Sequence, residues 1–162
     1  SSGMTCANLV LKYNNILVTR TFSKAFGLAS FRLGYVLGSA STLNGLRKIK
    51  NGKSVNSFAQ VAGVACLEDL PYLNKCVSQT KQSVKMFIEE VSEMDDYLAL
   101  DSVTNFVLLK VPDVDEFKKQ MESEKIMIRD RSYLTNLDNC VRINFGPLEY
   151  TRKILNTMKG KQ

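Results

Sequence analysis

The first third of the sequence contains two short apolar segments of strand length. Residues 16–19 read Ile-Leu-Val-Thr, a pattern typical of a strand that is buried on both faces of a parallel sheet. Residues 33–37 form a second such segment, and a polar loop with glycine, residues 20–30, lies between them. The pattern of residues 41–50 then predicts a helix that ends at Asn51-Gly52.

The remaining sequence predicts helices followed by a small sheet. Helices are predicted at a buried apolar segment, at a long amphipathic segment, at a segment begun by Asp113 and at a segment with Pro147 near its first turn: residues 55–67, 73–94, 114–121 and 147–158. Strands are predicted at residues 97–100, 105–110, 126–129 and 141–145. This order predicts an α/β segment followed by a smaller α+β unit.

Composition narrows the class of protein. With 162 residues, 44% hydrophobic and 23% charged, the chain has globular proportions and is long enough for one domain or part of a larger one. No apolar run approaches the roughly 20 residues that span a bilayer, and the N-terminus lacks the layout of a signal peptide. A soluble, cytoplasmic protein without a membrane partner is expected.

The charged residues and cysteines exclude further classes. The net charge is +6, but 22 basic residues are spread among 16 acidic ones, and the densest basic stretch, Arg47 to Lys53, has no aromatic residues to stack bases. A solvated helix end is therefore favoured over nucleic-acid binding. Four widely spaced cysteines and no histidine predict reduced thiols, no metal site and no histidine-activated nucleophile.

The candidate chemistry lies in the loop after the first predicted strand. Lys24 is flanked by the hydroxyl residues Thr21 and Ser23, and Arg32 follows eight positions later. Lysine is the usual partner of a carbonyl in Schiff-base chemistry, and hydroxyls with an arginine suit a phosphate dianion. Composition alone allows a surface turn with one solvated lysine as well.

The order of residues 21–35, TFSKAFGLASFRLGY, resembles the lysine signature of fold-type I pyridoxal-phosphate (PLP)-dependent aminotransferases, in particular the histidinol-phosphate aminotransferase branch. Ser30 stands where glycine is common in that branch. The resemblance implies that Lys24 forms the Schiff base with PLP and then acts as general acid and base. It also implies that Thr21, Ser23 and Arg32 bind the cofactor phosphate.

Two later segments resemble substrate-binding motifs of the same branch. Arg129 and Arg142 stand thirteen positions apart, as two arginines of that branch do. The resemblance implies that Arg142 grips the substrate carboxylate and that Arg129 contacts the phosphate or second polar end. Asn105 matches an asparagine near the pocket, whereas Arg131 is interpreted as a surface ion pair.

The resemblance covers the second half of the family's sequence. It implies that residues 1–52 end a large domain with a mostly parallel sheet and that residues 53–162 form a small α+β domain with a long connecting helix. The aspartate at the pyridine nitrogen, the glycine-containing phosphate loop, the asparagine beside the ring and a tyrosine from a second subunit have no counterpart here. The chain is therefore expected to be part of a longer, homodimeric enzyme and inactive alone, rather than a half-length protein that needs another chain.

Three functions fit this sequence. The resemblance implies transamination of an amino acid or amino-alcohol phosphate, of the type that uses histidinol phosphate and 2-oxoglutarate. A PLP-dependent lyase similar to threonine-phosphate decarboxylase shares much of the lysine motif. A non-catalytic interaction module derived from the family is the third hypothesis.

Overall fold

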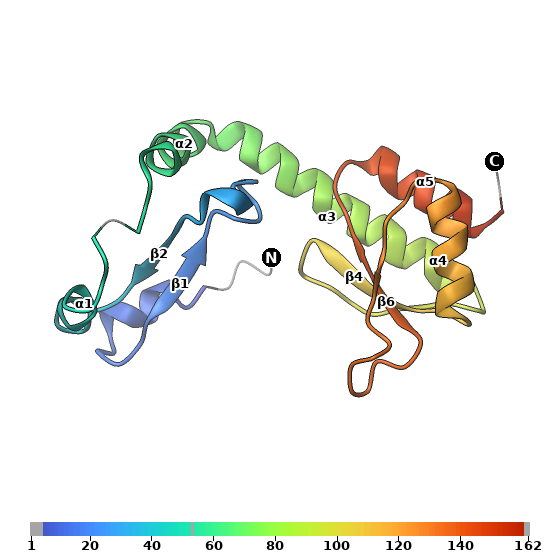
Figure 1. Cartoon of the computed structure of the whole chain (residues 1–162), viewed down its shortest axis with the longest axis horizontal. Helices are drawn as coiled ribbons and strands as arrows, with labels where there is room; N and C mark the ends of the chain where they lie inside the picture. Colours follow the sequence, from blue (N-terminus) through green and yellow to red (C-terminus); the bar gives the residue numbers. More distant parts are fainter. Residues whose placement is uncertain (1–4, 53, 161–162) are drawn as a thin grey trace. The chain divides into compact units, whose positions relative to one another are not determined.

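The computed structural model of the chain describes residues 5–52 and 54–160, and Figure 1 shows its helices and strands. The chain forms two compact units, Ser1–Asn74 and Lys75–Gln162, and each is described by itself. The sequence placed the domain boundary after residue 52 instead. Compactness within this chain does not define the domains of a longer protein, so the assignment of residues 1–52 and 53–162 to two domains stays a prediction.

The first unit contains a two-stranded antiparallel sheet. Strands β1 (Val18–Thr21) and β2 (Gly34–Leu37) pair with Thr21 opposite Gly34. Because a Cβ atom on Gly34 would lie 2.7 Å from the carbonyl oxygen of Arg20, glycine allows the strands to approach closely here. The short 3-10 helices η1 (Ala7–Leu11) and η2 (Ala29–Phe31) flank the sheet in sequence.

The parallel pairing expected for the strand at residues 16–19 is wrong for the described residues, whereas its burial on both faces refers to a complete sheet and stays a prediction. The strand begins at Val18, pairs antiparallel and is mostly exposed. The connection between the strands, residues 22–33, lacks the long helix that a parallel crossover needs, so it returns the chain alongside β1. The mixed helix-and-sheet class is nevertheless confirmed.

Two helices complete the first unit. Helix α1 (Ala40–Arg47) begins at Ser39, whose side chain accepts a hydrogen bond from the Thr42 N–H. Helix α2 (Ser57–Glu68) begins at Asn56 in the same way and buries only Ala59 and Gly63. The prediction of a buried helix at residues 55–67 is therefore wrong within the first unit, because the described residues of that unit provide no layer over the rest of the apolar surface of α2.

The second unit is a four-stranded antiparallel sheet with helices. The long helix α3 (Leu70–Ser92) leads into it, and the sheet order is β3-β4-β6-β5. These strands are β3 (Leu98–Ala99), β4 (Phe106–Lys110), β5 (Arg129–Asp130) and β6 (Cys140–Asn144). Helices α4 (Val114–Ser123) and α5 (Leu148–Met158) complete the unit. The Asp113 carboxylate caps α4 by accepting from the Glu116 N–H at 2.8 Å, as the sequence predicted.

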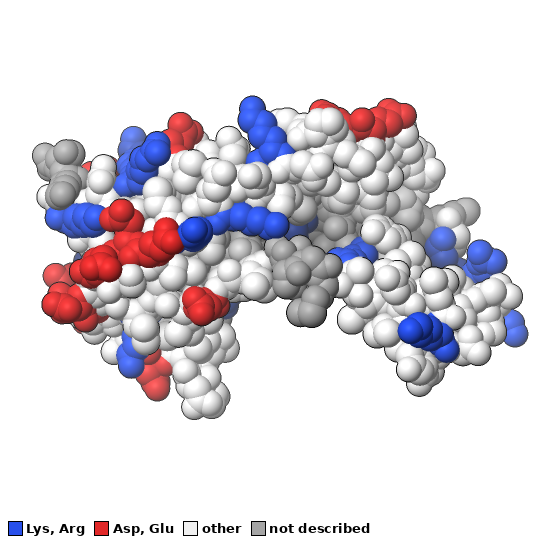
Figure 2. All heavy atoms as spheres, turned by 180° about the vertical axis from the view of Figure 1, so that it is seen from behind, with Lys and Arg blue, Asp and Glu red and all other residues white. Residues whose placement is uncertain are grey.

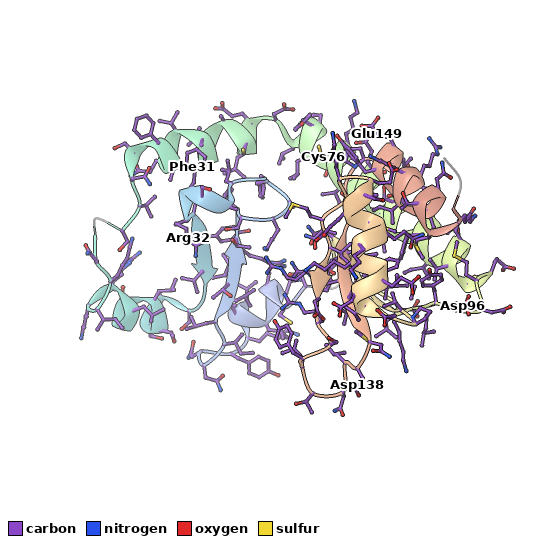
Figure 3. The ribbon with its side chains drawn as sticks, turned by 45° about the vertical axis from the view of Figure 1, so that its right-hand side comes forward. Phe31, Arg32, Cys76, Asp96, Asp138 and Glu149 are labelled. Carbon is purple, nitrogen blue, oxygen red and sulfur yellow. The ribbon has the colours of Figure 1, made fainter. Side chains whose placement is uncertain are left out.

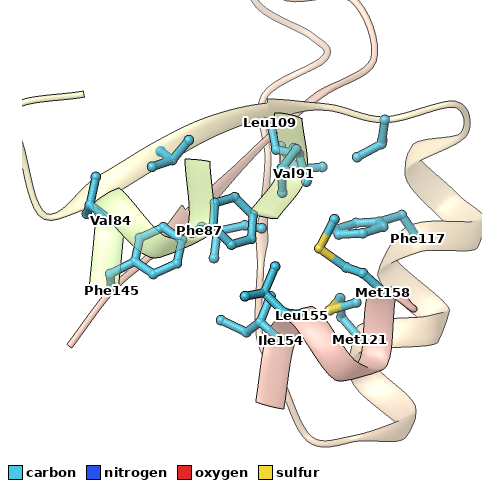
Figure 4. Packing of buried hydrophobic residues seen from close by; sticks show 14 residues of the cluster. Val84, Phe87, Val91, Leu109, Phe117, Met121, Phe145, Ile154, Leu155 and Met158 are labelled. Atoms are coloured by element: carbon cyan, nitrogen blue, oxygen red, sulfur yellow. The ribbon is translucent and has the colours of Figure 1, made fainter. Parts of the chain in front are cut away.

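One face of this sheet forms the core of the unit. Val107, Leu109, Val141 and Ile143, which alternate along β4 and β6, are at most 2% exposed. They pack against residues of α3, α4 and α5 such as Phe87, Met121 and Leu155 (Figure 4). Burying each such side chain contributes roughly 1.5–3 kcal/mol. Since strand side chains alternate between faces, the intervening residues point to the opposite face, away from these helices.

Candidate functional site

Lys24 lies in the loop of residues 22–33, whose ends are joined by backbone hydrogen bonds. The N–H of Phe22 donates to the Leu33 carbonyl at 3.0 Å, and the N–H of Leu28 donates to the Phe22 carbonyl at 3.0 Å. The Phe22 ring is buried and packs against the ring of Phe26, with centroids 4.6 Å apart. These contacts fix the two ends of the loop, so the sequence between them is presented on a rigid support.

Lys24 begins a tight turn within this loop. Its carbonyl accepts the Gly27 N–H at 2.9 Å, and Gly27 has a φ of 71°, a conformation that favours glycine. The Lys24 side chain is exposed, and none of the ion pairs in the described part of the chain includes it. The backbone therefore positions the lysine, and its amine forms no ion pair within this part of the chain.

The hydroxyls of Thr21 and Ser23 stand beside Lys24 in sequence. The Thr21 Oγ1 accepts the Ser23 N–H at 3.0 Å, which turns the chain at the end of β1. Within residues 5–52 and 54–160, neither hydroxyl donates a hydrogen bond to a protein acceptor. Both hydroxyl groups are thus available to an acceptor such as a phosphate oxygen.

Arg32 directly follows Phe31, the last residue of η2 (Figure 3). Its φ is 54° and its ψ is 40°, the left-handed region, which costs a non-glycine residue roughly 1–2 kcal/mol. Its side chain is exposed and makes one long hydrogen bond, from Nη1 to the Ala29 carbonyl at 3.4 Å. Backbone strain of this kind is concentrated at functional sites, and the Arg32 guanidinium forms no ion pair within the described residues. Both observations favour a binding role for Arg32.

The charge of the protein is concentrated in the first unit. Its sequence contains 8 basic and 2 acidic residues, whereas the second contains 14 of each, so the net charge of +6 lies entirely in the first unit. Figure 2 shows basic and acidic side chains of one face, intermixed mainly over the second unit. The basic stretch after α1 includes Lys53, which lies outside the described residues. A basic unit around Lys24 favours an anionic ligand.

Arg129 and Arg142 meet on the open face of the second sheet. They are Cα partners across β5 and β6, so their side chains leave the sheet on the same side. Leu108 of β4 is opposite Arg142 in turn, which makes this the face that α3, α4 and α5 do not cover. The structure therefore brings together two arginines that the sequence separates by thirteen positions.

The Arg142 guanidinium has no anionic partner among the described residues. Its Cζ lies 5.2 Å from the centroid of the Phe106 ring, a cation–π contact, and its buried Nε has no hydrogen-bond acceptor in the same part of the chain. Burial, followed by the charges of Arg131 and Arg129, lowers the pKa of Arg142. A buried N–H without an acceptor is costly, so an oxyanion bound here would relieve both effects.

Arg131 differs from its expected role as a surface ion pair. Its Nη1 donates to the Tyr133 hydroxyl at 2.8 Å, and no carboxylate of the described residues forms an ion pair with it. The neighbouring Asp130 accepts from the hydroxyl and the N–H of Ser132, each at 2.7 Å. The sequence indicated no functional role for Arg131, and the predicted strand ended at Arg129. Alternation of residues 129 and 131 on a longer strand is the signal that would have found it.

Asn105 lies at the end of the same sheet. Its carbonyl accepts the Phe145 N–H at 2.9 Å, and it directly precedes Phe106, over which Arg142 lies. Its side chain is exposed. The candidate residues therefore form two groups, Lys24 with its neighbours in the first unit and the arginines with Asn105 in the second.

Metal-binding clusters and membrane-spanning helices are not found in the described part of the chain. No group of three cysteine, aspartate or glutamate side chains is placed to hold a metal ion there. No helix in residues 5–52 and 54–160 is both long and apolar enough to cross a membrane.

Comparison with known proteins identifies the family. The sequence profile of the family described as aminotransferase class I and II matches residues 3–157. The chain belongs to the aminotransferase class I and II family, whose members depend on PLP. Its resemblance to the histidinol-phosphate branch is supported by relatives and by solved structures.

Two curated relatives illustrate the similarity. A dihydroxyacetone phosphate transaminase of Campylobacter jejuni is 36% identical over 90% of this chain and 40% of its own length. A histidinol-phosphate aminotransferase of Clostridium novyi is 30% identical over 98% of this chain and 44% of its own length. The chain thus spans less than half the length of these relatives.

Solved structures share the fold. The histidinol-phosphate aminotransferase of Clostridium acetobutylicum has a TM-score of 0.85 at 23% identity, covering 99% of this chain and 49% of its own. The L-threonine-O-3-phosphate decarboxylase of Porphyromonas gingivalis has a TM-score of 0.77 at 22% identity, covering 95% of this chain and 49% of its own. The expectation of a partial aminotransferase fold is confirmed.

Proposed function

We propose that this chain belongs to a PLP-dependent aminotransferase that acts on a phosphate-bearing amine of the histidinol-phosphate type, with a 2-oxo acid as acceptor. The observation that carries the proposal is the Arg142 guanidinium. It lies opposite Arg129, contacts the Phe106 ring and has a buried Nε without an acceptor among the described residues. These features together fit a site for an oxyanion.

The lysine loop fits the cofactor of the family. Thr21 and Ser23 have hydroxyls to donate, and Arg32 has a guanidinium without a carboxylate among the described residues. These groups would hold the cofactor phosphate, and Lys24 would bond to the cofactor carbonyl. When bound, PLP supplies an electron sink for the bond broken at the α-carbon of the substrate.

Lys24 would carry the proton transfers. With PLP bound, the Lys24 amine would be the group of this chain that moves a proton at the α-carbon of the substrate. Exposure of Lys24 on a fixed turn leaves Nζ free to reach a substrate carbon and to return the proton at a second atom. The loop therefore supplies positioning and proton movement, while the cofactor stabilises charge.

Arg142 and Arg129 would orient the substrate. A guanidinium binds a carboxylate or phosphate through two parallel hydrogen bonds, which fixes direction as well as position. Arg142 would take the carboxylate of the amino or oxo acid, and Arg129 would take the second polar end. Asn105, beside Phe106, would border the same face.

Two alternatives follow from the comparisons. The relative named as a dihydroxyacetone phosphate transaminase and the neighbour named as a threonine-phosphate decarboxylase both have phosphate monoesters in their names. Arg129 and Arg142 could bind the phosphate of either substrate. The two alternatives therefore differ in the reaction: a transaminase transfers an amino group, whereas a decarboxylase releases carbon dioxide.

A cytoplasmic homodimer is part of the proposal, by analogy with the family.

An assay of the full-length protein tests the proposal. Histidinol phosphate with 2-oxoglutarate, dihydroxyacetone phosphate with glutamate, and phosphothreonine alone are offered in parallel. Glutamate formed from the first mixture supports the proposal. Carbon dioxide from phosphothreonine without amino transfer would indicate the lyase. Turnover of only the second mixture would identify dihydroxyacetone phosphate, and not histidinol phosphate, as the substrate. A protein that neither reacts nor binds PLP would be a non-catalytic module.

A further inference from the structure

A third arginine shares the open face with Arg129 and Arg142. The Arg131 N–H donates to the Cys140 carbonyl at 2.9 Å, which continues the pairing of β5 with β6 by one residue. Since Arg131 stands two positions after Arg129, the alternation of a strand directs both side chains to the same face. Three guanidinium groups therefore leave this end of the sheet on one side.

A neutral group holds Arg131 in place. Its Nη1 donates to the Tyr133 hydroxyl at 2.8 Å, and this contact fixes one arm of the guanidinium without neutralising its charge. The neighbouring carboxylate, Asp130, accepts both hydrogen bonds from Ser132 through its Oδ1. Its charge interacts with that of Arg131, but the two side chains form none of the ion pairs in the described part of the chain. The remaining N–H groups of Arg131 are thus available to a ligand.

Three positive charges on one face repel one another unless an anion joins them. In the described part of the chain, no carboxylate forms an ion pair with Arg129, Arg131 or Arg142. The lowered pKa of Arg142 has burial as its main cause and the charges of Arg131 and Arg129 as the next ones. A carboxylate carries one charge, whereas a phosphate monoester carries about 1.5–2 negative charges near pH 7 and offers three acceptor oxygens.

We propose that Arg131, held by Tyr133, is a specificity-determining residue that recognises the phosphate end of the substrate and distinguishes it from a carboxylate. The identity of the substrate in this inference rests on the proposed function, whereas the anion site rests on the positions of the three arginines alone. Arg131 completes the face begun by Arg129 and Arg142, and Tyr133 acts as a positioning residue through Arg131.

Kinetics of the full-length protein test this role. In the variant Arg131→Gln, the KM for histidinol phosphate should rise about tenfold or more relative to wild type, because a hydrogen bond to a charged group is lost. The KM for unphosphorylated histidinol and for 2-oxoglutarate should stay within about twofold. Arg131→Lys should recover part of the loss, and Tyr133→Phe should show a smaller rise for the phosphorylated substrate only.

Arg152→Gln is the matched control. It removes the same charge from an exposed position on α5, the helix that packs on the other face of the sheet. Equal kinetics of Arg131→Gln and Arg152→Gln would overturn the inference. So would an equal loss for histidinol and histidinol phosphate, which would indicate a structural role.

Binding of inorganic phosphate separates this inference from the proposed function. Calorimetric titration of phosphate into full-length protein saturated with PLP should show weaker binding by about tenfold for Arg131→Gln than for Arg152→Gln. This difference in a protein without transaminase activity would leave the inference standing and the proposed function wrong. An active enzyme whose two variants bind phosphate equally would leave the proposed function standing and the inference wrong.

Discussion

Arg129 and Arg142 are Cα partners across β5 and β6, on the sheet face that the three helices of the second unit leave open. Like charges directly opposite each other destabilise a sheet, so this pair costs stability in the protein without a ligand. The arrangement is understandable if an oxyanion bridges the two side chains. The pair therefore connects the sheet register to substrate binding.

Replacing Arg142 by lysine tests the bidentate geometry. The variant Arg142→Lys keeps the charge but loses the planar fork, and each lost hydrogen bond to a charged group costs roughly 1.5–3 kcal/mol. The KM of the full-length enzyme for its carboxylate substrate should rise tens-fold, while PLP binding is unchanged. Steady-state kinetics beside an Arg152→Lys control measure this, and equal KM values for the two variants would make Arg142 an ordinary structural residue.

The contribution of the Asp130 carboxylate to the stability of the fold should depend on pH. The Ser132 hydroxyl and then the Ser132 N–H hold its pKa below the usual value of 3.8. Because the folded pKa is depressed, the stabilisation is present above the unfolded pKa and is lost as pH falls through the folded pKa. Carbon-13 NMR titration of the carboxyl should show the low pKa, and Ser132→Ala should raise it. Thr135→Ala, also between β5 and β6, is the control and should leave the pKa of Asp130 unchanged. An Asp130 pKa that is the same in Ser132→Ala as in wild type would contradict the assignment.

Ser83 predicts a local contribution to stability. It is fully buried on α3, and its hydroxyl donates to the Gly146 carbonyl at 2.8 Å, between β6 and α5. Ser83→Ala should lower the free energy of unfolding by about 1 kcal/mol, because one hydrogen bond is removed. Ser78→Ala, at an exposed position of the same helix, should change it little in denaturant unfolding. Equal midpoints for the two variants would mean that the bond contributes nothing.

The sequence predicts local features of the fold better than long-range ones. The cap at Asp113 and the apolar spacing of α3 are local signals, and both are present in the structure. The direction of pairing between β1 and β2 depends on the path of residues 22–33, which the apolar pattern of the strands does not encode. The exposure of α2 has a similar origin, because periodicity reports apolar surface and not what covers it.

The candidate site divides in the same way. Lys24, Thr21, Ser23 and Arg32 stand in one sequence motif, so a resemblance over fifteen positions sufficed to select them. Arg131 could not be selected in this way, because its significance depends on a strand register that joins it to Arg142, eleven positions away. The roles of all these residues stay predictions until they are measured.

The chain alone is predicted to lack transaminase activity. Two strands seldom form a stable sheet by themselves, and Phe58 and Val61 of α2 are 81% and 72% exposed. Such apolar surface favours association in solution. Light scattering of the purified 162-residue chain should show oligomers or aggregates, and assays should show no turnover. A monomeric, active preparation would contradict this prediction.

The proposed function depends above all on a covalent bond between Lys24 and PLP, and borohydride trapping tests this bond most directly. The full-length protein is reduced with borohydride, digested and examined by mass spectrometry, with Lys24→Ala and Lys12→Ala variants treated in parallel. We expect a pyridoxyl-phosphate adduct on the peptide that contains Lys24 in wild type and in Lys12→Ala, and no such adduct in Lys24→Ala. An adduct on a different lysine, or an unmodified Lys24 in a protein that has bound PLP, would contradict the assignment of Lys24.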